Sequence, residues 1–247
     1  MSVRSEIERA IAEGAAQLRS GLPDGGAAKL ADYVQLLAKW NAKINLTAVR
    51  DPAQMVTHHI LDCLAAVPEI AKLAYSNHRT LTPNPSPLEG EGSDQPSAQV
   101  RLADVGTGAG LPGLVIALAQ PQMQVTCIDT VEKKIAFVQQ AIGVLGLKNA
   151  KAVASRTENL QESFDVVTCR AFASLVDMVA MAGHLLKPDG LLLAMKGPKA
   201  EEEAAALPAG WLFLGAIELV VPGLNEERKL AVIRKAMTND FVPVALE

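Results

Sequence analysis

Cysteine, aromatic residues and long apolar runs are all scarce in this chain of 247 residues. The three cysteines lie far apart in the sequence, which argues against a disulfide framework or a zinc site and suits a reducing compartment. Aromatic residues make up 4% of the chain, too few to bind a single-stranded nucleic acid by stacking on successive bases. No apolar run approaches the ~20 residues of a membrane-spanning helix, and the N-terminus lacks the apolar core of a signal peptide. We therefore expect a cytoplasmic protein with no membrane contact and no bound metal.

The chain also lacks an excess of positive charge, because its formal net charge is −4. This balance excludes a protein that coats nucleic acid over much of its surface, although it leaves room for a local basic patch. Apolar residues make up 49% of the sequence, so a complete core can be buried. The length suits one large α/β domain, or such a domain with a helical extension.

The most informative stretch runs from Val100 to Thr130. It consists of an apolar run at 100–105, the glycine-rich turn GTGAGLPG at 106–113, an apolar helix-length segment at 114–119 and a second apolar run at 123–128 that ends at Asp129. This order predicts a strand, a glycine turn, a helix and a strand with an acid at its tip, which is a nucleotide-binding half-unit. Glycines suit such a turn because they permit positive φ and bring backbone N–H groups close to a ligand. A carboxylate at the strand tip can accept hydrogen bonds from both hydroxyls of a ribose, so the stretch predicts an adenosine-type cofactor.

Helix and strand patterns continue on both sides of this stretch. Before it, apolar spacing predicts three helices. The first lies at about 5–20, the second ends near residue 43, and the third lies at about 52–73 with Asp51 as its N-cap. After it, the patterns predict helices at 132–146, 175–186 and 201–207, strands at 150–154, 164–169, 191–195, 211–221 and 229–235, and a turn at 187–190. Such alternation requires a parallel sheet with helices on both faces, here of seven strands, with the last two strands antiparallel to each other.

Three regions follow from this pattern. Residues 1–75 form a helical extension packed on the core, and residues 100–247 form the main domain. Between them, residues 76–99 carry four prolines and almost no apolar side chains, which predicts a flexible surface insertion and not a functional loop.

The glycine turn also satisfies the dinucleotide pattern G-x-G-x-x-G, with Asp129 about twenty residues on, so an NAD(P)-dependent oxidoreductase is one alternative. Three features favour S-adenosylmethionine instead. The turn begins early, with Asp104 and Gly106 already at the strand end, and the chain lacks a second mononucleotide half. A carboxylate at Asp104 repels a pyrophosphate but attracts a sulfonium and an α-amino group. We therefore predict that S-adenosylmethionine is bound by a set of residues from the turn and the second strand: Asp104, Gly106, Thr107, Gly108 and Asp129.

Several further segments resemble one family. The segment N-x-x-x-N-L-T-A-x-R-D at 41–51 is similar to the signature of the glucose-inhibited division protein B family, the bacterial ribosomal RNA small-subunit methyltransferase G enzymes. The same resemblance extends to HILDCL at 59–64, DVGTGAGLPG at 104–113, RAFAS at 170–174 and Lys196-Gly197. It covers nearly the whole chain except residues 76 to about 99.

The resemblance implies a class I methyltransferase fold of the Rossmann-like type. It also implies transfer of a methyl group from S-adenosylmethionine to N7 of one guanine in 16S ribosomal RNA. By matching positions, it places cofactor contacts at Gly106, Leu111, Thr157, Glu158 and Arg170.

The chemistry of this reaction makes few demands on catalytic side chains. N7 of guanine already presents a lone pair, so no proton has to be removed before attack, and we expect no obligatory general base. Positioning alone can supply about 7–11 kcal/mol. Cys169 lies inside a predicted strand, so we interpret it as a buried structural thiol and not as a nucleophile.

Strand ends supply the remaining candidates. Arg170, Arg156 and Lys196 each follow a predicted strand, where ligands bind in open α/β sheets, and we predict that they contact the guanine or its phosphate. In the segment after the second helix, we predict that Asn45 and Arg50 face the RNA. The expected partner is 16S ribosomal RNA, free or within the small ribosomal subunit, and the expected state is a monomer. A non-catalytic ribosome-assembly factor that binds the cofactor or RNA without turnover remains a second alternative.

Overall fold

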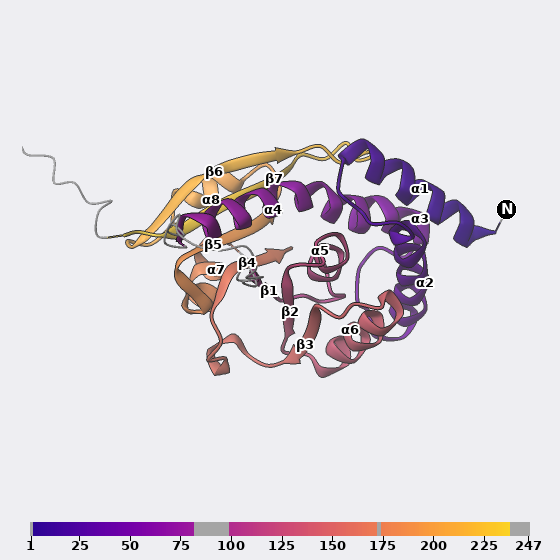
Figure 1. The fold of residues 1–247 in the computed structure, drawn as a ribbon, viewed down its shortest axis with the longest axis horizontal. Coiled ribbons are helices and arrows are strands. Elements are labelled where there is room, and N and C mark those ends of the chain that lie inside the picture. The colour runs from indigo at the N-terminus through magenta and orange to yellow at the C-terminus, as the bar shows by residue number, and fades with distance from the viewer. Residues whose placement is uncertain (1, 82–98, 172–173, 238–247) are drawn as a thin grey trace, which may run out of the picture.

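The computed structural model describes residues 2–81, 99–171 and 174–237. Its centre is a seven-stranded sheet in the order β3-β2-β1-β4-β5-β7-β6 (Figure 1). The strands are β1 (Arg101–Val105), β2 (Gln124–Asp129), β3 (Ala150–Ala154), β4 (Phe164–Arg170), β5 (Leu186–Lys196), β6 (Trp211–Leu219) and β7 (Arg228–Lys235). The first five are parallel, while β7 runs antiparallel to both β5 and β6. The predicted sheet of seven strands with an antiparallel final pair is confirmed.

Helices cover both faces of this sheet, because neighbouring residues of each buried strand point to opposite sides. On one face, Leu102 and Val166 share a core with helices α4 (Asp62–Leu81), α5 (Gly113–Ala119) and α6 (Glu132–Leu145). On the other face, Ala103 and Val167 pack with α7 (Leu175–Ala182) and with Ala200, the first residue of α8 (Ala200–Ala204). Short 3₁₀ turns follow β3 and α7, at Thr157–Asn159 and Gly183–Leu185. The result is a three-layer α/β/α sandwich.

The N-terminal helices join the first of these cores. Helix α1 (Val3–Leu18) begins at the N-cap Ser2, and α2 (Gly26–Ile44) packs against both α1 and α6. Asp51 caps α3 (Pro52–Met55), accepting a hydrogen bond from the Ala53 N–H, as the sequence predicts. Figure 1 shows these helices gathered at one side of the molecule, beyond α5 and α6. Their buried side chains belong to the same apolar cluster as strands β1, β2 and β4.

Several sequence-based boundaries are wrong. The helix expected at 175–186 ends at Ala182, and the strand expected at 191–195 begins at Leu186. The third helix does not end near residue 73; it contains a π-helical turn at Val56–Leu61 and continues as α4 to Leu81. The expected insertion at 76–99 therefore overlaps the end of α4, and residues 82–98 of it lie outside the described part of the chain. The expected turn at 187–190 belongs to β5, where the pairing with β4 shifts so that these residues bulge from the ladder.

Candidate functional site: two clefts at one edge of the sheet

Parallel strands end at the same edge of a sheet, and two clefts open at this edge. The first, which we call the cofactor cleft, has a volume of about 290 Å³ and lies over the ends of β1, β2 and β3. Five predicted site residues line it together: Gly106, Asp129, Arg156, Thr157 and Glu158. They come from three separate strand ends, so the tertiary structure brings together what the sequence keeps apart.

The glycine turn forms one wall of the cofactor cleft. Gly106, Gly108 and Gly110 have φ of 68°, 57° and 84°, a left-handed conformation that other residues adopt with strain. The turn is fastened to the neighbouring strand, because the Thr107 N–H donates to the Ile128 carbonyl over 3.0 Å. Leu111, the remaining predicted contact in this segment, is buried within the apolar core beside the turn. Positive φ at these positions is what the sequence predicts.

The side chain of Asp104 holds the glycine turn through hydrogen bonds. Its side chain is fully buried, and Oδ2 accepts hydrogen bonds from the Thr107 hydroxyl at 2.5 Å and the Gly113 N–H at 2.8 Å. Burial raises the pKa of this carboxyl to about 6, against the opposing effect of the two hydrogen bonds. Oδ1 is buried and has no hydrogen-bond partner among the described residues. The predicted contact between Asp104 and the cofactor stays a prediction, and the structure adds a role in holding the turn.

Asp129 forms the other wall of the cofactor cleft. Its Oδ1 accepts from the Val131 N–H at 2.9 Å, and its Oδ2 accepts from the Gly108 N–H at 3.1 Å and from Lys134 Nζ at 3.3 Å. The carboxylate therefore stays in a fixed orientation at the tip of β2. A carboxylate oriented in this way can accept hydrogen bonds from ribose hydroxyls.

The residues of the cofactor cleft fit S-adenosylmethionine. Asp129, Thr157 and Glu158 line the cleft together, as binding of a ribose and an adenine would need, and their contacts with these groups stay predictions. Asp104 does not line the cleft, but it lies beneath the glycine turn with one carboxylate oxygen free of hydrogen bonds among the described residues, and a negative charge there would favour a sulfonium and an amino group. The alternative cofactor NAD(P) requires a second mononucleotide half, and the antiparallel pair β6 and β7 takes its place in the sheet.

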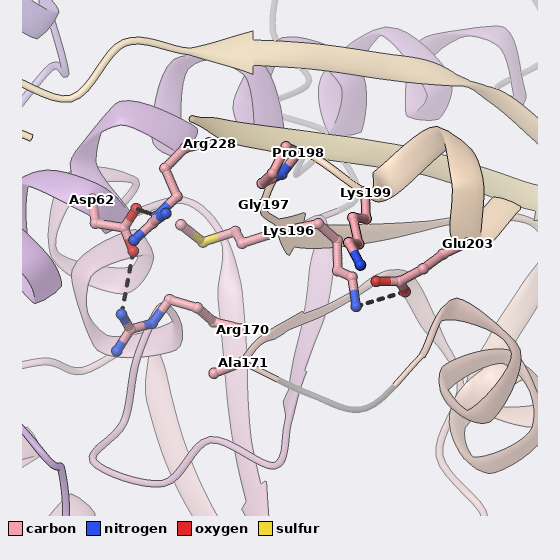
Figure 2. A pocket seen from close by; sticks show the side chains of 10 residues that line it. Asp62, Arg170, Ala171, Lys196, Gly197, Pro198, Lys199, Glu203 and Arg228 are labelled. Atoms are coloured by element: carbon pink, nitrogen blue, oxygen red, sulfur yellow. Dashed lines mark hydrogen bonds and ion pairs between the residues drawn. The ribbon is translucent and has the colours of Figure 1, made fainter. Parts of the chain in front are cut away.

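The second cleft, which we call the acceptor cleft, has a volume of about 440 Å³ and lies at the ends of β4 and β5 (Figure 2). Four basic side chains and two carboxylates line it, with smaller residues between them: Arg170, Lys196, Lys199, Arg228, Asp62, Glu203, Ala171, Met195, Gly197 and Pro198. Ala171 has a φ of 53°, a strained conformation for a residue with a side chain, and such strain clusters at functional sites. The cleft is therefore a local basic site on an acidic chain, which the net charge of the sequence leaves room for.

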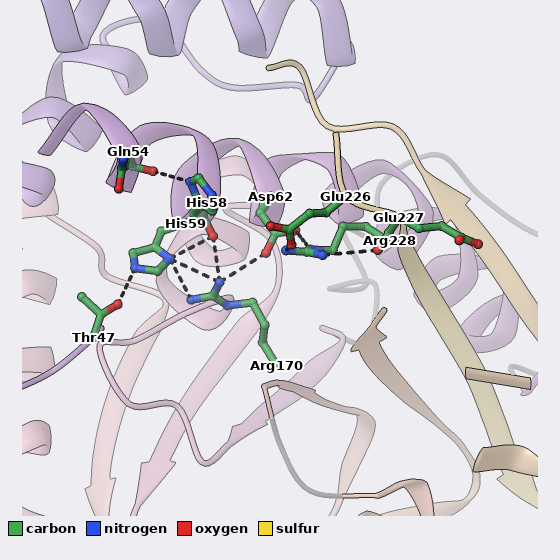
Figure 3. Close-up of polar contacts among 9 residues, drawn as sticks. All are labelled: Thr47, Gln54, His58, His59, Asp62, Arg170, Glu226, Glu227 and Arg228. Atoms are coloured by element: carbon green, nitrogen blue, oxygen red, sulfur yellow. Dashed lines mark hydrogen bonds and ion pairs between the residues drawn. The ribbon is translucent and has the colours of Figure 1, made fainter. Parts of the chain in front are cut away.

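Arg170 connects this cleft to the N-terminal helices (Figure 3). Its guanidinium donates to the His58 carbonyl at 3.0 Å and forms an ion pair with Asp62 at 3.2 Å. These acceptors, and the His59 ring at 3.4 Å, lie on or beside the π-helical turn at Val56–Leu61. π-Helical turns are rare and are frequent at functional sites. The predicted contact of Arg170 with the guanine or the cofactor stays a prediction, because in this structure most of its hydrogen bonds go to the helix.

His59 extends this network toward the segment between α2 and α3. Its Nε2 lies 2.7 Å from Thr47 Oγ1. Burial, and then the positive charge of Arg170, lower the pKa of His59 to about 4, so the ring is neutral at neutral pH. In the same segment, Arg50 donates to the Asn45 side chain at 2.8 Å, and both side chains are exposed. Their predicted contact with RNA stays a prediction.

The other two candidates lie in different clefts. Lys196 lines the acceptor cleft and forms an ion pair of 2.7 Å with Glu203, whereas Arg156 lines the cofactor cleft. The structure therefore does not place Arg156, Arg170 and Lys196 in one catalytic cluster. Cys169 is buried against Met178, and burial raises its pKa, which fits the structural interpretation of this thiol.

Sequence reasoning missed four residues of the acceptor cleft: Asp62, Lys199, Glu203 and Arg228. Asp62 falls within the segment HILDCL, which was a usable signal. Arg228 had none, because it enters the cleft only through the antiparallel pairing of β7 with β5. Among the described residues, no group of three or more histidine, cysteine or acidic side chains is arranged to hold a metal ion. Within the same residues, no helix has the length and apolar character needed to span a membrane.

Comparison with known proteins agrees with this geometry. The family model described as rRNA small subunit methyltransferase G matches residues 27–76 and 93–232. A protein named ribosomal RNA small subunit methyltransferase G from Acidovorax sp. (strain JS42) is 44% identical over 236 residues, which cover 95% of this chain and 99% of that protein. One of the same name from Ralstonia nicotianae (strain ATCC BAA-1114 / GMI1000) is 44% identical over 234 residues, covering 93% and 94% of the two chains. The chain has the class I methyltransferase fold and belongs to the rRNA small subunit methyltransferase G family.

Proposed function

We propose that this protein transfers a methyl group from S-adenosylmethionine to N7 of one guanine in 16S ribosomal RNA. One observation carries the proposal: a cleft suited to an adenosine and a basic cleft open at the same edge of one sheet. The family assignment supports the reaction class and the RNA, since the relatives are named small-subunit ribosomal RNA methyltransferases. The atom N7 follows from the family resemblance of the sequence motifs.

The cofactor cleft holds and orients the methyl donor. S-adenosylmethionine supplies an electrophilic methyl group on a sulfonium. Asp129 would hold its ribose, and Thr157 and Glu158 would hold its adenine. The glycine turn brings backbone close to the ligand, and its shape is maintained by the hydrogen bonds of Asp104 to Thr107 and Gly113.

The acceptor cleft holds the nucleotide. Its basic side chains attract the phosphates of the RNA, and its walls are fixed by ion pairs that join β4, β5 and β7 to helices α4 and α8. Attack by N7 needs no proton transfer, because the ring nitrogen carries a free lone pair. The work of the protein is therefore orientation and exclusion of water, which are the functions of a rigid cleft.

We infer that the protein acts as a monomer in the cytoplasm, and that its substrate is 16S RNA within the small ribosomal subunit or as free RNA. An acidic chain with a local basic cleft is suited to a shaped target, because the electrostatic attraction is local. Binding should then weaken as salt rises.

Methyl transfer from labelled S-adenosylmethionine tests the function directly. The acceptors are 16S RNA and small subunits from cells that lack the corresponding modification, and the digested nucleosides are identified by mass. Label in 7-methylguanosine is the expected result. Label in another nucleoside would overturn the assignment of N7. Bound cofactor without label in either RNA would overturn the reaction and favour a non-catalytic assembly factor.

A further inference from the structure

Arg228 is the least expected residue of the acceptor cleft. It is the first residue of β7, and β7 runs antiparallel to β5, so its beginning lies beside the end of β5, where Lys196 pairs with Lys229. The pairing therefore places the positive side chain of Arg228, from the C-terminal part of the chain, in the same cleft as Arg170 and Lys196. In Figure 2, Arg228 and Arg170 approach Asp62 from opposite sides.

Two hydrogen bonds and one ion pair hold the guanidinium of Arg228. Its Nε lies 3.2 Å from Asp62 Oδ1, one terminal nitrogen lies 2.6 Å from Glu226 Oε2, and the other donates to the Glu227 carbonyl at 3.2 Å (Figure 3). Each terminal nitrogen of a guanidinium carries two hydrogens, so each can donate a second hydrogen bond to an anion. About a fifth of the side chain is exposed, at 22%, so an anion in the cleft can reach it.

Asp62 fixes the two arginines relative to each other. Its carboxylate is 4% exposed and contacts Arg170 through Oδ2 and Arg228 through Oδ1, both at 3.2 Å. A carboxylate shared in this way neutralises only one of the two positive charges. Four basic side chains, with Lys199 and with Lys196 paired to Glu203, stand against three carboxylates once Glu226, which is paired to Arg228, is counted, so the cleft keeps an excess of one positive charge. On a chain of net charge −4, this local excess suits an anionic ligand.

We propose that Arg228 binds a phosphate group of the RNA strand in the acceptor cleft, and that Asp62 is the positioning residue that holds its guanidinium there. This inference rests on the proposed function and adds to it the side chain that binds the phosphate backbone of the RNA. A guanidinium suits a phosphate because its N–H groups match the geometry of two phosphate oxygens. Arg170 directs both of its terminal nitrogens toward the π-helical turn and Asp62, whereas each terminal nitrogen of Arg228 makes one of the contacts given above and can donate a second hydrogen bond.

Binding of unmodified small subunits, measured over a range of KCl concentrations with S-adenosylhomocysteine present to prevent turnover, tests the proposal. The variant is Arg228→Gln, and the matched control is Arg234→Gln, which makes the same change six residues further along β7, where that strand pairs with Leu191. Arg228→Gln should raise the Kd for the subunit roughly tenfold and reduce the slope of log Kd against log salt by about 0.7 to 0.9, as loss of one phosphate contact requires. Arg234→Gln should leave both unchanged.

A second measurement separates binding from folding. Arg228→Gln leaves Asp62 with one fewer counter-ion and should lower the Tm, while Asp62 keeps its ion pair with Arg170. Binding is therefore measured at a temperature where circular dichroism shows Arg228→Gln to be fully folded. If Arg228 binds phosphate, the folded variant has the reduced salt slope. If Arg228 serves only to neutralise Asp62, the folded variant has the wild-type slope, and the proposal is overturned.

Two further outcomes distinguish this proposal from others. A weaker affinity for S-adenosylmethionine in Arg228→Gln, with an unchanged salt slope for RNA, would assign the guanidinium to the cofactor carboxylate and overturn the RNA contact. Formation of 7-methylguanosine by the wild-type protein is measured separately. If it forms while the slope of Arg228→Gln equals that of wild type, only the role of Arg228 fails.

Discussion

Gly113 provides the sharpest test of how the glycine turn is built. It is the first residue of α5, and its N–H donates to Asp104 Oδ2 over 2.8 Å. A Cβ at this position would lie 2.8 Å from both Asp104 Oδ2 and Cys127 Sγ, distances that Cβ atoms do not tolerate. Both neighbours are themselves fully buried, in β1 and β2, so neither can move aside without disturbing the sheet. Gly113→Ala should therefore destabilise the protein, although alanine favours a helix more than glycine does.

The magnitude follows from three effects. Overpacking a rigid core destabilises by about 1–3 kcal/mol, and weakening a hydrogen bond to a carboxylate removes up to about 1.5–3 kcal/mol. The better helix propensity of alanine returns about 1 kcal/mol. We expect a net loss of about 2–4 kcal/mol in the free energy of unfolding. A weaker affinity for S-adenosylmethionine should accompany it, since the same contact shapes the wall of the cofactor cleft.

Urea unfolding followed by circular dichroism measures this loss, and Gly143→Ala is the matched control. Gly143 lies inside α6, and a Cβ there meets no atom within 4 Å, so the same substitution should stabilise the protein by about 0.5–1 kcal/mol. The two variants should thus shift the midpoint of unfolding in opposite directions. If Gly113→Ala is as stable as Gly143→Ala, the close packing of the turn against Asp104 does not hold.

Three other predictions concern the cofactor cleft and the buried titrating groups. Asp129→Asn should raise the Kd for S-adenosylmethionine at least about tenfold by calorimetry, because a charged acceptor is lost, while Asp165→Asn at the opposite edge of the sheet should not. Burial raises the pKa of Asp104 to about 6, so its contribution to the free energy of unfolding is present below pH 3.8 and is lost as pH rises through 6. This loss amounts to about 3 kcal/mol, and unfolding curves of Asp104→Asn should lack it. The pKa of His59 is lowered to about 4, so its contribution is present above pH 6.5 and is lost as pH falls through 4, by roughly 3 kcal/mol. His59→Gln should remove that acid loss, and identical pH slopes for wild type and both variants would contradict both pKa shifts.

The functional edge of the sheet combines local and distant contributions. The glycine turn and Asp129 are separated by about twenty residues and belong to one strand–turn–helix–strand unit, so a local sequence pattern predicts that they lie close together. Arg156, Thr157 and Glu158 join them because β3 pairs with β2 in parallel register, with Ala154 beside Asp129. Parallel strands place their ends at one edge, so the structure brings these residues together, while their contacts with the cofactor stay predictions.

The sequence alone determined the order of the elements, the glycine turn and the antiparallel final pair. Apolar periodicity, glycine and the N-cap at Asp51 are local signals, and each acts through the backbone of neighbouring residues. These signals also sufficed for the family resemblance, because its motifs keep their order along the chain.

Only the tertiary structure decided how the acceptor cleft is made. Asp62 lies 108 positions before Arg170, and Arg228 reaches the same carboxylate from the other end of the chain. No local pattern encodes that contact, because it depends on which strand β7 pairs with and on where the helix after the π-helical turn packs. Burial likewise decided the roles of Asp104 and His59, since the energy of a charged group depends on the water that the rest of the fold removes from it. A linear sequence fixes which groups can ionise, while the folded core sets at what pH they do so.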